Sequence, residues 1–226
     1  MWLDTFFPRR CKLCGCRLAE DEKIVCLSCA RKLSLTDDCL SPYDNITARM
    51  LWGRMPIERA TALTYYHPGA YSSLLMYKLK YGNEPDIGVW FGEYMANSLM
   101  PYGVFDDIDM VIPLPIHKRR ERERGYNQSQ EIARGIGDIS SIKVQNNIVE
   151  RSRYTVSQTK LTHTDRTKNV KGAFTLLRPD AIRGKHVLLV DDIITTGATI
   201  AACANELAKA EDVKISIMTV GRTHYI

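Results

Sequence analysis

The sequence contains no long apolar run, no internal repeat and no low-complexity tract. A membrane helix needs about 20 predominantly apolar residues in a row, so we expect no membrane insertion. The N-terminus lacks the basic region and apolar core of a signal peptide, which favours a cytoplasmic location. Positive charge is in small excess, formally +5 over 226 residues, and does not by itself indicate a nucleic-acid partner. The 45% hydrophobic and 25% charged residues are ordinary for a globular enzyme with one sizeable domain and a small appendage.

Cysteine is concentrated near the N-terminus, and of the seven cysteines only Cys203 is remote. Two pairs have the C-x-x-C spacing that aims two thiolates at one ion, and two such pairs complete a tetrahedron. Because a cytoplasmic chain is kept reduced, a zinc ion is favoured over disulfides. Four thiolates leave no open position for water, so we expect a structural zinc site formed by Cys11, Cys14, Cys26 and Cys29.

Cys16 and Cys39 lie close to these pairs and could each replace one zinc ligand, although free thiols are the simpler interpretation. A polar stretch from 35 to 46 follows the first cysteines and is typical of a boundary. We therefore predict a zinc-binding module and linker over residues 1–46 and a larger domain over residues 47–226.

The most informative stretch of the chain runs from 186 to 200. Residues 187–190 form a short continuous apolar run, which predicts a parallel strand covered on both faces. Asp191 and Asp192 follow at the expected end of this strand, and then come a small hydroxyl-rich turn and a helix start. Gly197 lets the backbone approach a ligand, and free N–H groups at a helix start bind anions. Carboxylates beside a phosphate cradle indicate a phosphorylated sugar, although a plain strand–turn–helix unit with a polar cap is the alternative.

The chain after residue 46 alternates between strand-like and helical patterns. This alternation predicts an α/β fold with a parallel sheet flanked by helices. We expect strands at 59–66 and 108–115, helices at 70–80, 85–100 and 127–139, and an extended segment at 144–149.

A basic segment follows the strand expected at 108–115. Residues 118–124 hold five basic and two acidic side chains, a local charge of +3, and Gly125 then permits a tight turn. A solvated helix face is the simplest interpretation of these charges, but a basic loop at the carboxyl end of a parallel strand is also where α/β proteins bind ligands. The long polar segment 151–169 is either a functional loop or a disordered connector.

The run HVLLVDDIITTGATI resembles the motif by which type I phosphoribosyltransferases bind 5-phosphoribosyl 1-pyrophosphate (PRPP). The resemblance implies that Asp191 and Asp192 are the catalytic acidic pair, which holds the ribose 2- and 3-hydroxyls in the presence of Mg²⁺. It also implies that the basic segment meets the pyrophosphate and that the 151–169 loop closes over it and excludes water. The residues expected to bind the phosphates of PRPP are Thr195, Thr196, Gly197, Ala198 and Thr199 in the turn, and Arg124, Gly125, Asn127 and Gln128 after the basic segment.

Nearly the whole chain is similar to the ComF family, a competence-associated and amidophosphoribosyltransferase-like group. The matching pieces, in order, are the two cysteine pairs, YKLKYG at 77–82, PLPIHKRRERERGYNQ, QTKLTHTDRTKNVKGAF and VLLVDDIITTGAT. The similarity implies a role in the uptake of transforming DNA, with other competence proteins as partners.

Two functions follow from these expectations. The first is a phosphoribosyltransferase. Its acceptor is open, but Thr195 stands where enzymes for 6-oxopurines carry an aspartate, which argues against hypoxanthine and guanine. The second is a non-catalytic factor that binds single-stranded DNA and uses PRPP as an effector, with Tyr126 and Tyr154 available for base stacking.

Overall fold

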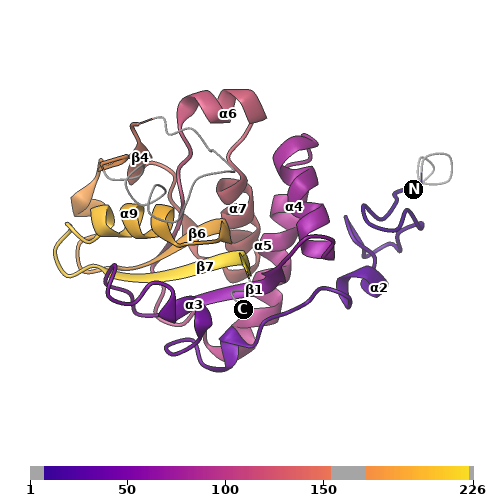
Figure 1. Ribbon diagram of the computed structural model, residues 1–226, viewed down its shortest axis with the longest axis horizontal. Helices are drawn as coiled ribbons and strands as arrows, with labels where there is room; N and C mark the ends of the chain where they lie inside the picture. Colours follow the sequence, from indigo (N-terminus) through magenta and orange to yellow (C-terminus); the bar gives the residue numbers. More distant parts are fainter. Residues whose placement is uncertain (1–7, 154–171, 224–226) are drawn as a thin grey trace.

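A five-stranded parallel sheet forms the centre of the molecule, whose computed structural model describes residues 8–153 and 172–223 (Figure 1). Each neighbouring pair of strands in this sheet is parallel. The strand order is β1 (Ala60–Tyr66), β7 (Lys214–Thr223), β6 (His186–Ile194), β2 (Met110–Pro113) and β3 (Lys143–Val144).

Helices cover both faces of this sheet. On one face α4 (Tyr71–Tyr81), α5 (Asp86–Leu99) and α7 (Gln128–Ser140) form a buried apolar cluster with Leu188 and Val190. On the other face α9 (Ala198–Leu207) packs over Val187 and Leu189. Alternate residues of β6 therefore point to opposite cores, which explains why its apolar run is continuous. The predicted parallel sheet with flanking helices is confirmed.

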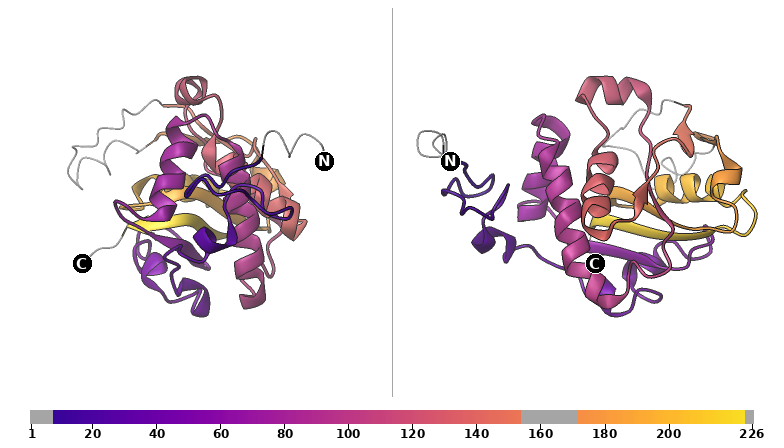
Figure 2. Two further views of the ribbon diagram at one scale, coloured as in Figure 1. Left: turned by 90° about the vertical axis from the view of Figure 1, so that its right-hand side faces the viewer. Right: turned by 180° about the vertical axis from the view of Figure 1, so that it is seen from behind.

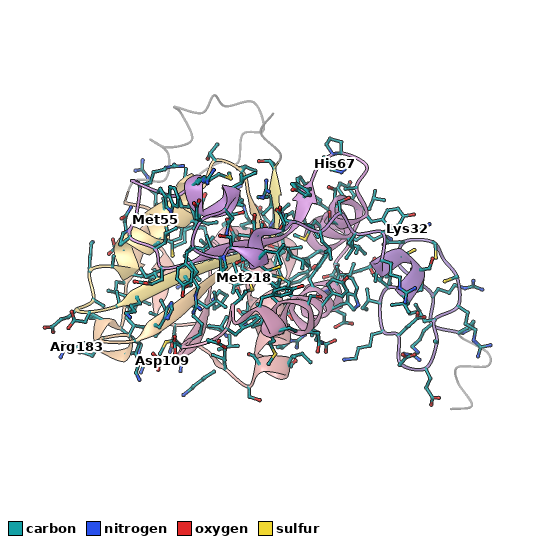
Figure 3. The ribbon with its side chains drawn as sticks, turned by 90° about the horizontal axis from the view of Figure 1, so that it is seen from below. Lys32, Met55, His67, Asp109, Arg183 and Met218 are labelled. Atoms are coloured by element: carbon teal, nitrogen blue, oxygen red, sulfur yellow. The ribbon has the colours of Figure 1, made fainter. Side chains whose placement is uncertain are left out.

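Parallel pairing brings the equivalent ends of the strands together. Asp109 and Arg183, which precede β2 and β6, lie near one another, whereas His67 follows β1 and lies well away from them (Figure 3). The remaining elements are short: α2 (Leu27–Ala30), η1 (Asp38–Leu40), α3 (Ile46–Arg49), η2 (Met100–Tyr102), α6 (Lys118–Arg124), η3 (Pro179–Ala181) and the antiparallel pair β4 (Val149–Arg151) and β5 (Phe174–Leu176).

The structure differs from one local expectation and decides between two interpretations of another segment. The strand expected to end at Asp191 continues through β6 to Ile194, because β7 stays paired with it as far as Arg222. Of the two interpretations of the basic segment, the helix is confirmed: it is α6, with His117 accepting the Arg119 N–H at its start and Gly125 ending it in the left-handed region. An Arg119–Glu123 ion pair one turn apart supports this helix.

The cysteine-rich segment packs against the start of α5 and beside α4, at one end of the molecule (Figure 2). Two ion pairs join it to the larger domain, Lys12 to Glu84 at 2.7 Å and Lys23 to Glu93 at 2.6 Å. The boundary at residue 46 stays a prediction, but residues before it already contact the sheet, since the Thr36 N–H donates to the Leu63 carbonyl of β1.

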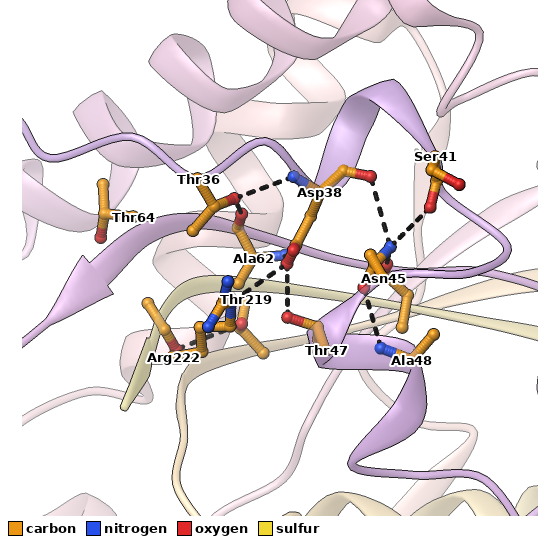
Figure 4. A network of polar contacts seen from close by, with 12 residues as sticks. Thr36, Asp38, Ser41, Asn45, Thr47, Ala48, Ala62, Thr64, Thr219 and Arg222 are labelled. Atoms are coloured by element: carbon orange, nitrogen blue, oxygen red, sulfur yellow. Dashed lines mark hydrogen bonds and ion pairs between the residues drawn. The ribbon is translucent and has the colours of Figure 1, made fainter. Parts of the chain in front are cut away.

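A buried ionic contact fixes this approach to the sheet (Figure 4). Asp38 and Arg222 are 1% and 0% exposed, and their carboxylate and guanidinium lie 3.5 Å apart. The same carboxylate accepts from the Thr47 hydroxyl and from the Ala62 N–H at 3.1 Å. Because breaking a buried pair leaves an uncompensated charge, this contact ties the segment before α3 firmly to β1 and β7.

In the part of the chain that the structure describes, the helices are all too short or too polar to cross a bilayer.

Candidate functional site

The sheet changes direction of winding between β2 and β6. The chain from β2 passes through α7 to β3, whereas the chain from β6 passes through α9 on the other face to β7. Ligands of open α/β sheets bind at such a switch point, outside the carboxyl ends of the strands. The ladder between β2 and β6 ends at Pro113 and Val190, so Asp191 and Asp192 come directly after it and lie at this switch point.

The two carboxylates of the acidic pair have different partners. Asp191 Oδ1 accepts from the Ser129 hydroxyl at 3.0 Å and from the Asp192 N–H at 2.8 Å. Asp192 Oδ2 lies 2.8 Å from the Lys80 ammonium, which comes from the last turn of α4. Two carboxylates are therefore held side by side by one hydroxyl and one cation.

The electrostatics of the pair favour a proton near neutral pH. Burial, and after it the Asp192 charge, raise the pKa of Asp191 to about 7, although the Asp192 N–H, Lys80 and Ser129 act in the opposite direction. Burial alone would lower the pKa of Lys80, but the Asp192 and Asp191 carboxylates outweigh it and raise that pKa. Lys80 therefore stays a cation, and the pKa of Asp191 lies near neutral pH.

The turn after β6 is positioned by both backbone and side-chain contacts. Gly197 has φ +71° and caps α9, and a Cβ atom there would lie 2.8 Å from Leu51 Cδ2, so glycine is required. The Thr196 hydroxyl accepts the Ala198 N–H at 3.4 Å, and the Thr196 carbonyl accepts from Arg54. Thr195, Ala198 and Thr199 belong to the same turn and to the first turn of α9.

The second group of expected phosphate ligands lies where α6 meets α7. Asn127 caps α7 by accepting the Ser129 N–H at 3.1 Å, and its Nδ2 donates to the Leu114 carbonyl at 3.1 Å. Arg124 donates to Gln128 Oε1 at 2.7 Å, and its charge acts on Lys80, which places it near the acidic pair. Gln128 is 1% exposed, and its Nε2 has no protein partner among the described residues. Gly125, at φ +84°, provides the turn between the two helices.

Several residues that sequence patterns did not assign contact this site. Lys80 pairs with Asp192, Ser129 binds Asp191, and Arg54 holds the Thr196 carbonyl. Arg151, at the start of the expected 151–169 loop, interacts with Asp191 and Arg120. Residues 154–169 of that loop lie outside the described residues.

One of the two tyrosines expected to be available for base stacking, Tyr126, lies among the described residues. Tyr126 is partly buried against the core, and its hydroxyl donates to the Leu79 carbonyl near the end of α4. It therefore joins α4 to the turn between α6 and α7. The other expected stacking residue, Tyr154, is outside the described residues.

The N-terminal thiols gather in one cluster. Sulfur atoms of Cys11, Cys14, Cys16 and Cys26 lie within 4.8 Å of one another, and those of Cys14 and Cys26 are 3.7 Å apart. Thiolates about 2.3 Å from a tetrahedral zinc stand about 3.8 Å apart, so these residues fit a zinc ion. Cys29 is buried and interacts with the Cys14, Cys26 and Cys11 thiols, so the choice between Cys16 and Cys29 as fourth ligand stays a prediction.

Protein purified without chelator is expected to contain close to one zinc per chain by elemental analysis, because closed thiolate sites hold zinc tightly. Cys14→Ser should lose the metal, and Cys39→Ser, outside the cluster, should retain it. Of Cys16→Ser and Cys29→Ser, the variant that loses zinc identifies the fourth ligand. Only trace zinc in the wild-type protein would contradict the site.

Comparisons with known proteins agree with this geometry. Residues 111–222, from β2 to the end of β7, match the family model of the phosphoribosyl transferase domain. The DNA utilization protein YhgH of Escherichia coli K12 is 27% identical over 227 residues, which cover 96% of this chain and 98% of the relative. The competence protein F of Haemophilus influenzae is 37% identical over 102 residues, 45% of this chain and 43% of the relative. The competence protein ComFC of Bacillus subtilis is 31% identical over 110 residues, 46% of this chain and 41% of the relative.

Among solved structures, the glutamine PRPP amidotransferase of B. subtilis is similar with a TM-score of 0.41 and 19% identity, covering 62% of this chain and 30% of that one. The family-model match and the parallel sheet show a phosphoribosyltransferase-like fold that includes residues 111–222. The chain is thus similar over nearly its whole length to the YhgH proteins, and over part of its length to the two competence proteins.

Proposed function

We propose that this protein binds PRPP in the presence of Mg²⁺ and transfers its phosphoribosyl group to an acceptor. The observation that carries the proposal is the acidic pair at the switch point, held by Ser129 and Lys80 and followed by the turn that starts α9. Carboxylates at this place suit the ribose hydroxyls, and the N–H groups of the turn suit the 5-phosphate.

The remaining charges suit the leaving group. When the bond at the anomeric carbon breaks, pyrophosphate gains negative charge and the sugar becomes oxocarbenium-like. Arg124 is close to the acidic pair and can meet that charge with a planar fork of donors. The acidic pair offers the oxygen ligands that a hard cation prefers, and Mg²⁺ bound together with PRPP would help to neutralise the charge of the pyrophosphate.

A second candidate function is the binding of single-stranded DNA, with PRPP as an effector. The names of the relatives, DNA utilization and competence proteins, favour this link. The observation that supports it in this chain is α6, whose five basic and two acidic residues follow one another beside the proposed PRPP site. Both functions are compatible if the acceptor is nucleic acid or one of its bases.

Titration of the protein with Mg²⁺ and PRPP by calorimetry tests the main proposal, and saturable binding is expected. Lys80→Met should weaken binding at pH 7, because loss of the cation raises the pKa of Asp191 and protonates the carboxylate that must accept from ribose. Its affinity should recover as the pH rises, since Asp192, Arg124, Arg151 and Ser129 remain. Lys80→Arg should retain binding.

Lys78→Met is the matched control, because Lys78 lies on the same helix but faces Glu84, 3.9 Å away. An affinity of Lys80→Met that stays low at every pH would indicate a purely structural defect. A wild-type protein that does not bind PRPP would refute the proposed function. If the wild-type protein does bind PRPP, release of pyrophosphate in a screen of bases, amines and oligonucleotides would identify the acceptor.

A further inference from the structure

Two large aromatic rings are exposed on α4, beside the proposed PRPP site. Tyr77 and Tyr81 are 66% and 67% exposed and stand one helical turn apart. Their ring centroids are 5.0 Å apart at an interplanar angle of 48°. Neither ring contributes to the core, so the pair offers ring surface to a ligand.

The position of the pair is fixed relative to the acidic residues. The Arg124 guanidinium lies over the Tyr81 ring, 5.7 Å from its centroid, and the Gln128 amide oxygen holds Arg124. The Tyr126 hydroxyl bonds the Leu79 carbonyl, which keeps the end of α4 next to α6 (Figure 1). Lys80, between the two tyrosines in sequence, reaches Asp192. A ring stacked on Tyr81 would therefore lie next to the sugar site.

The charges around the pair favour a polyanion with planar groups. The exposed helix α6 carries a local charge of +3. A hollow of about 580 Å³ lies along it, lined by Lys118, Glu121, Arg122 and Gly125. Single-stranded nucleic acid is bound by such a combination, in which cations follow the phosphates and aromatic rings stack on the bases. A free base could stack on the rings, but it has no phosphates to pair with the basic side chains of α6, so the combination favours a nucleic-acid strand.

We propose that Tyr77 and Tyr81, together with the basic side chains of α6, form a base-stacking surface for single-stranded nucleic acid that holds a base next to the sugar–phosphate site. This proposal rests on the second candidate function, the binding of single-stranded DNA, and names the residues that would contact the DNA. Leu74, 47% exposed and one turn before Tyr77, extends the apolar stripe along α4. A helix of a partner protein could bind along that stripe, but the neighbouring basic side chains favour single-stranded nucleic acid as the ligand.

Fluorescence anisotropy with a short labelled deoxyoligonucleotide tests the surface. Tyr77→Ala and Tyr81→Ala should each weaken binding at least about fivefold, because stacking of one base contributes about 1–3 kcal/mol. Tyr77→Phe and Tyr81→Phe keep the rings and should bind close to wild type. Tyr102→Ala is the matched control, since Tyr102 is half exposed but lies beyond the far end of α5. Tyr77→Ala should leave PRPP titrations unchanged, because Tyr81, and not Tyr77, is the ring that lies under Arg124.

Three results would overturn the proposal. If the wild-type protein binds the oligonucleotide and the double variant Tyr77→Ala/Tyr81→Ala binds equally well, the surface is wrong although DNA binding stands. If the wild type binds no oligonucleotide while it binds PRPP, both the surface and the second function fail, and the phosphoribosyltransferase proposal is unaffected. If free nucleosides bind in a tyrosine-dependent way and oligonucleotides do not, the pair is a site for a free base.

Discussion

The double variant Asp191→Asn/Asp192→Asn is expected to bind PRPP about tenfold more weakly than the wild-type protein, or worse, since hydrogen bonds to charged groups contribute about 1.5–3 kcal/mol each. Both carboxylates lie at the switch point beyond the end of β2, where they suit the ribose hydroxyls. Asparagine keeps an acceptor oxygen at each position but removes the charge, so the substitutions test charge-assisted bonding and leave the shape of the site largely unchanged.

Calorimetry in the presence of Mg²⁺ measures this effect. Asp180→Asn is a suitable control, because the Asp180 side chain is 82% exposed and pairs only with surface residues such as Arg183. The double variant should remain folded, since Lys80 is only partly buried and still finds oxygen acceptors. Unchanged affinity in the folded double variant would remove the acidic pair from the PRPP site.

Local patterns were sufficient to predict the sheet and the acidic motif. The apolar run 187–190 predicted a strand covered on both faces, and β6 points alternate side chains into two cores. The turn at Gly197 was also expected, because a positive φ at a helix start needs glycine. These features depend on residues that are adjacent in sequence, which is why a single sequence reveals them.

The contacts between distant segments could not be predicted in this way. Lys80 is 112 residues from Asp192, and nothing near it in the sequence indicates a carboxylate partner. The YKLKYG run was one of the pieces similar to the ComF family, but the similarity gave its residues no role. Only the structure separates Lys80, which faces Asp192, from the exposed Tyr77 and Tyr81. The bond from the Tyr126 hydroxyl to a carbonyl of α4 was not predicted either, and the stacking of this ring on bases stays a prediction.

The cysteine spacing predicted the thiolate cluster but not which four cysteines form it. Two C-x-x-C pairs predicted a thiolate cluster, and the structure contains one, but it places Cys16 in the group of four. Spacing defines which thiols can approach an ion and does not decide among five that are all nearby.

The stretch 35–46 is a similar case: its polar residues are typical of a linker, yet Asp38 is buried against Arg222 because a charge 184 residues away neutralises it.

Asp191→Asn alone is expected to stabilise the fold, and more at pH 8 than at pH 5. Burial raises the Asp191 pKa from 3.8 to about 7, so between these values the folded protein holds a proton that the unfolded chain has lost. Stability from this group is therefore greatest at low pH and falls as the pH rises to about 7, where the buried carboxylate ionises. The amide is neutral throughout and keeps an acceptor for the Ser129 hydroxyl and the Asp192 N–H.

The free energy of unfolding, measured with denaturant at both pH values, should show the variant gaining about 2–3 kcal/mol more at pH 8 than at pH 5, since two pKa units correspond to about 2.7 kcal/mol. Asp180→Asn, at an exposed position, should show little such difference. An equal gain at both pH values would mean that Asp191 is already ionised in the folded protein at pH 5. A larger gain at pH 8 with weaker PRPP binding would show that the protein keeps a destabilising buried carboxylate at this site because the sugar needs it.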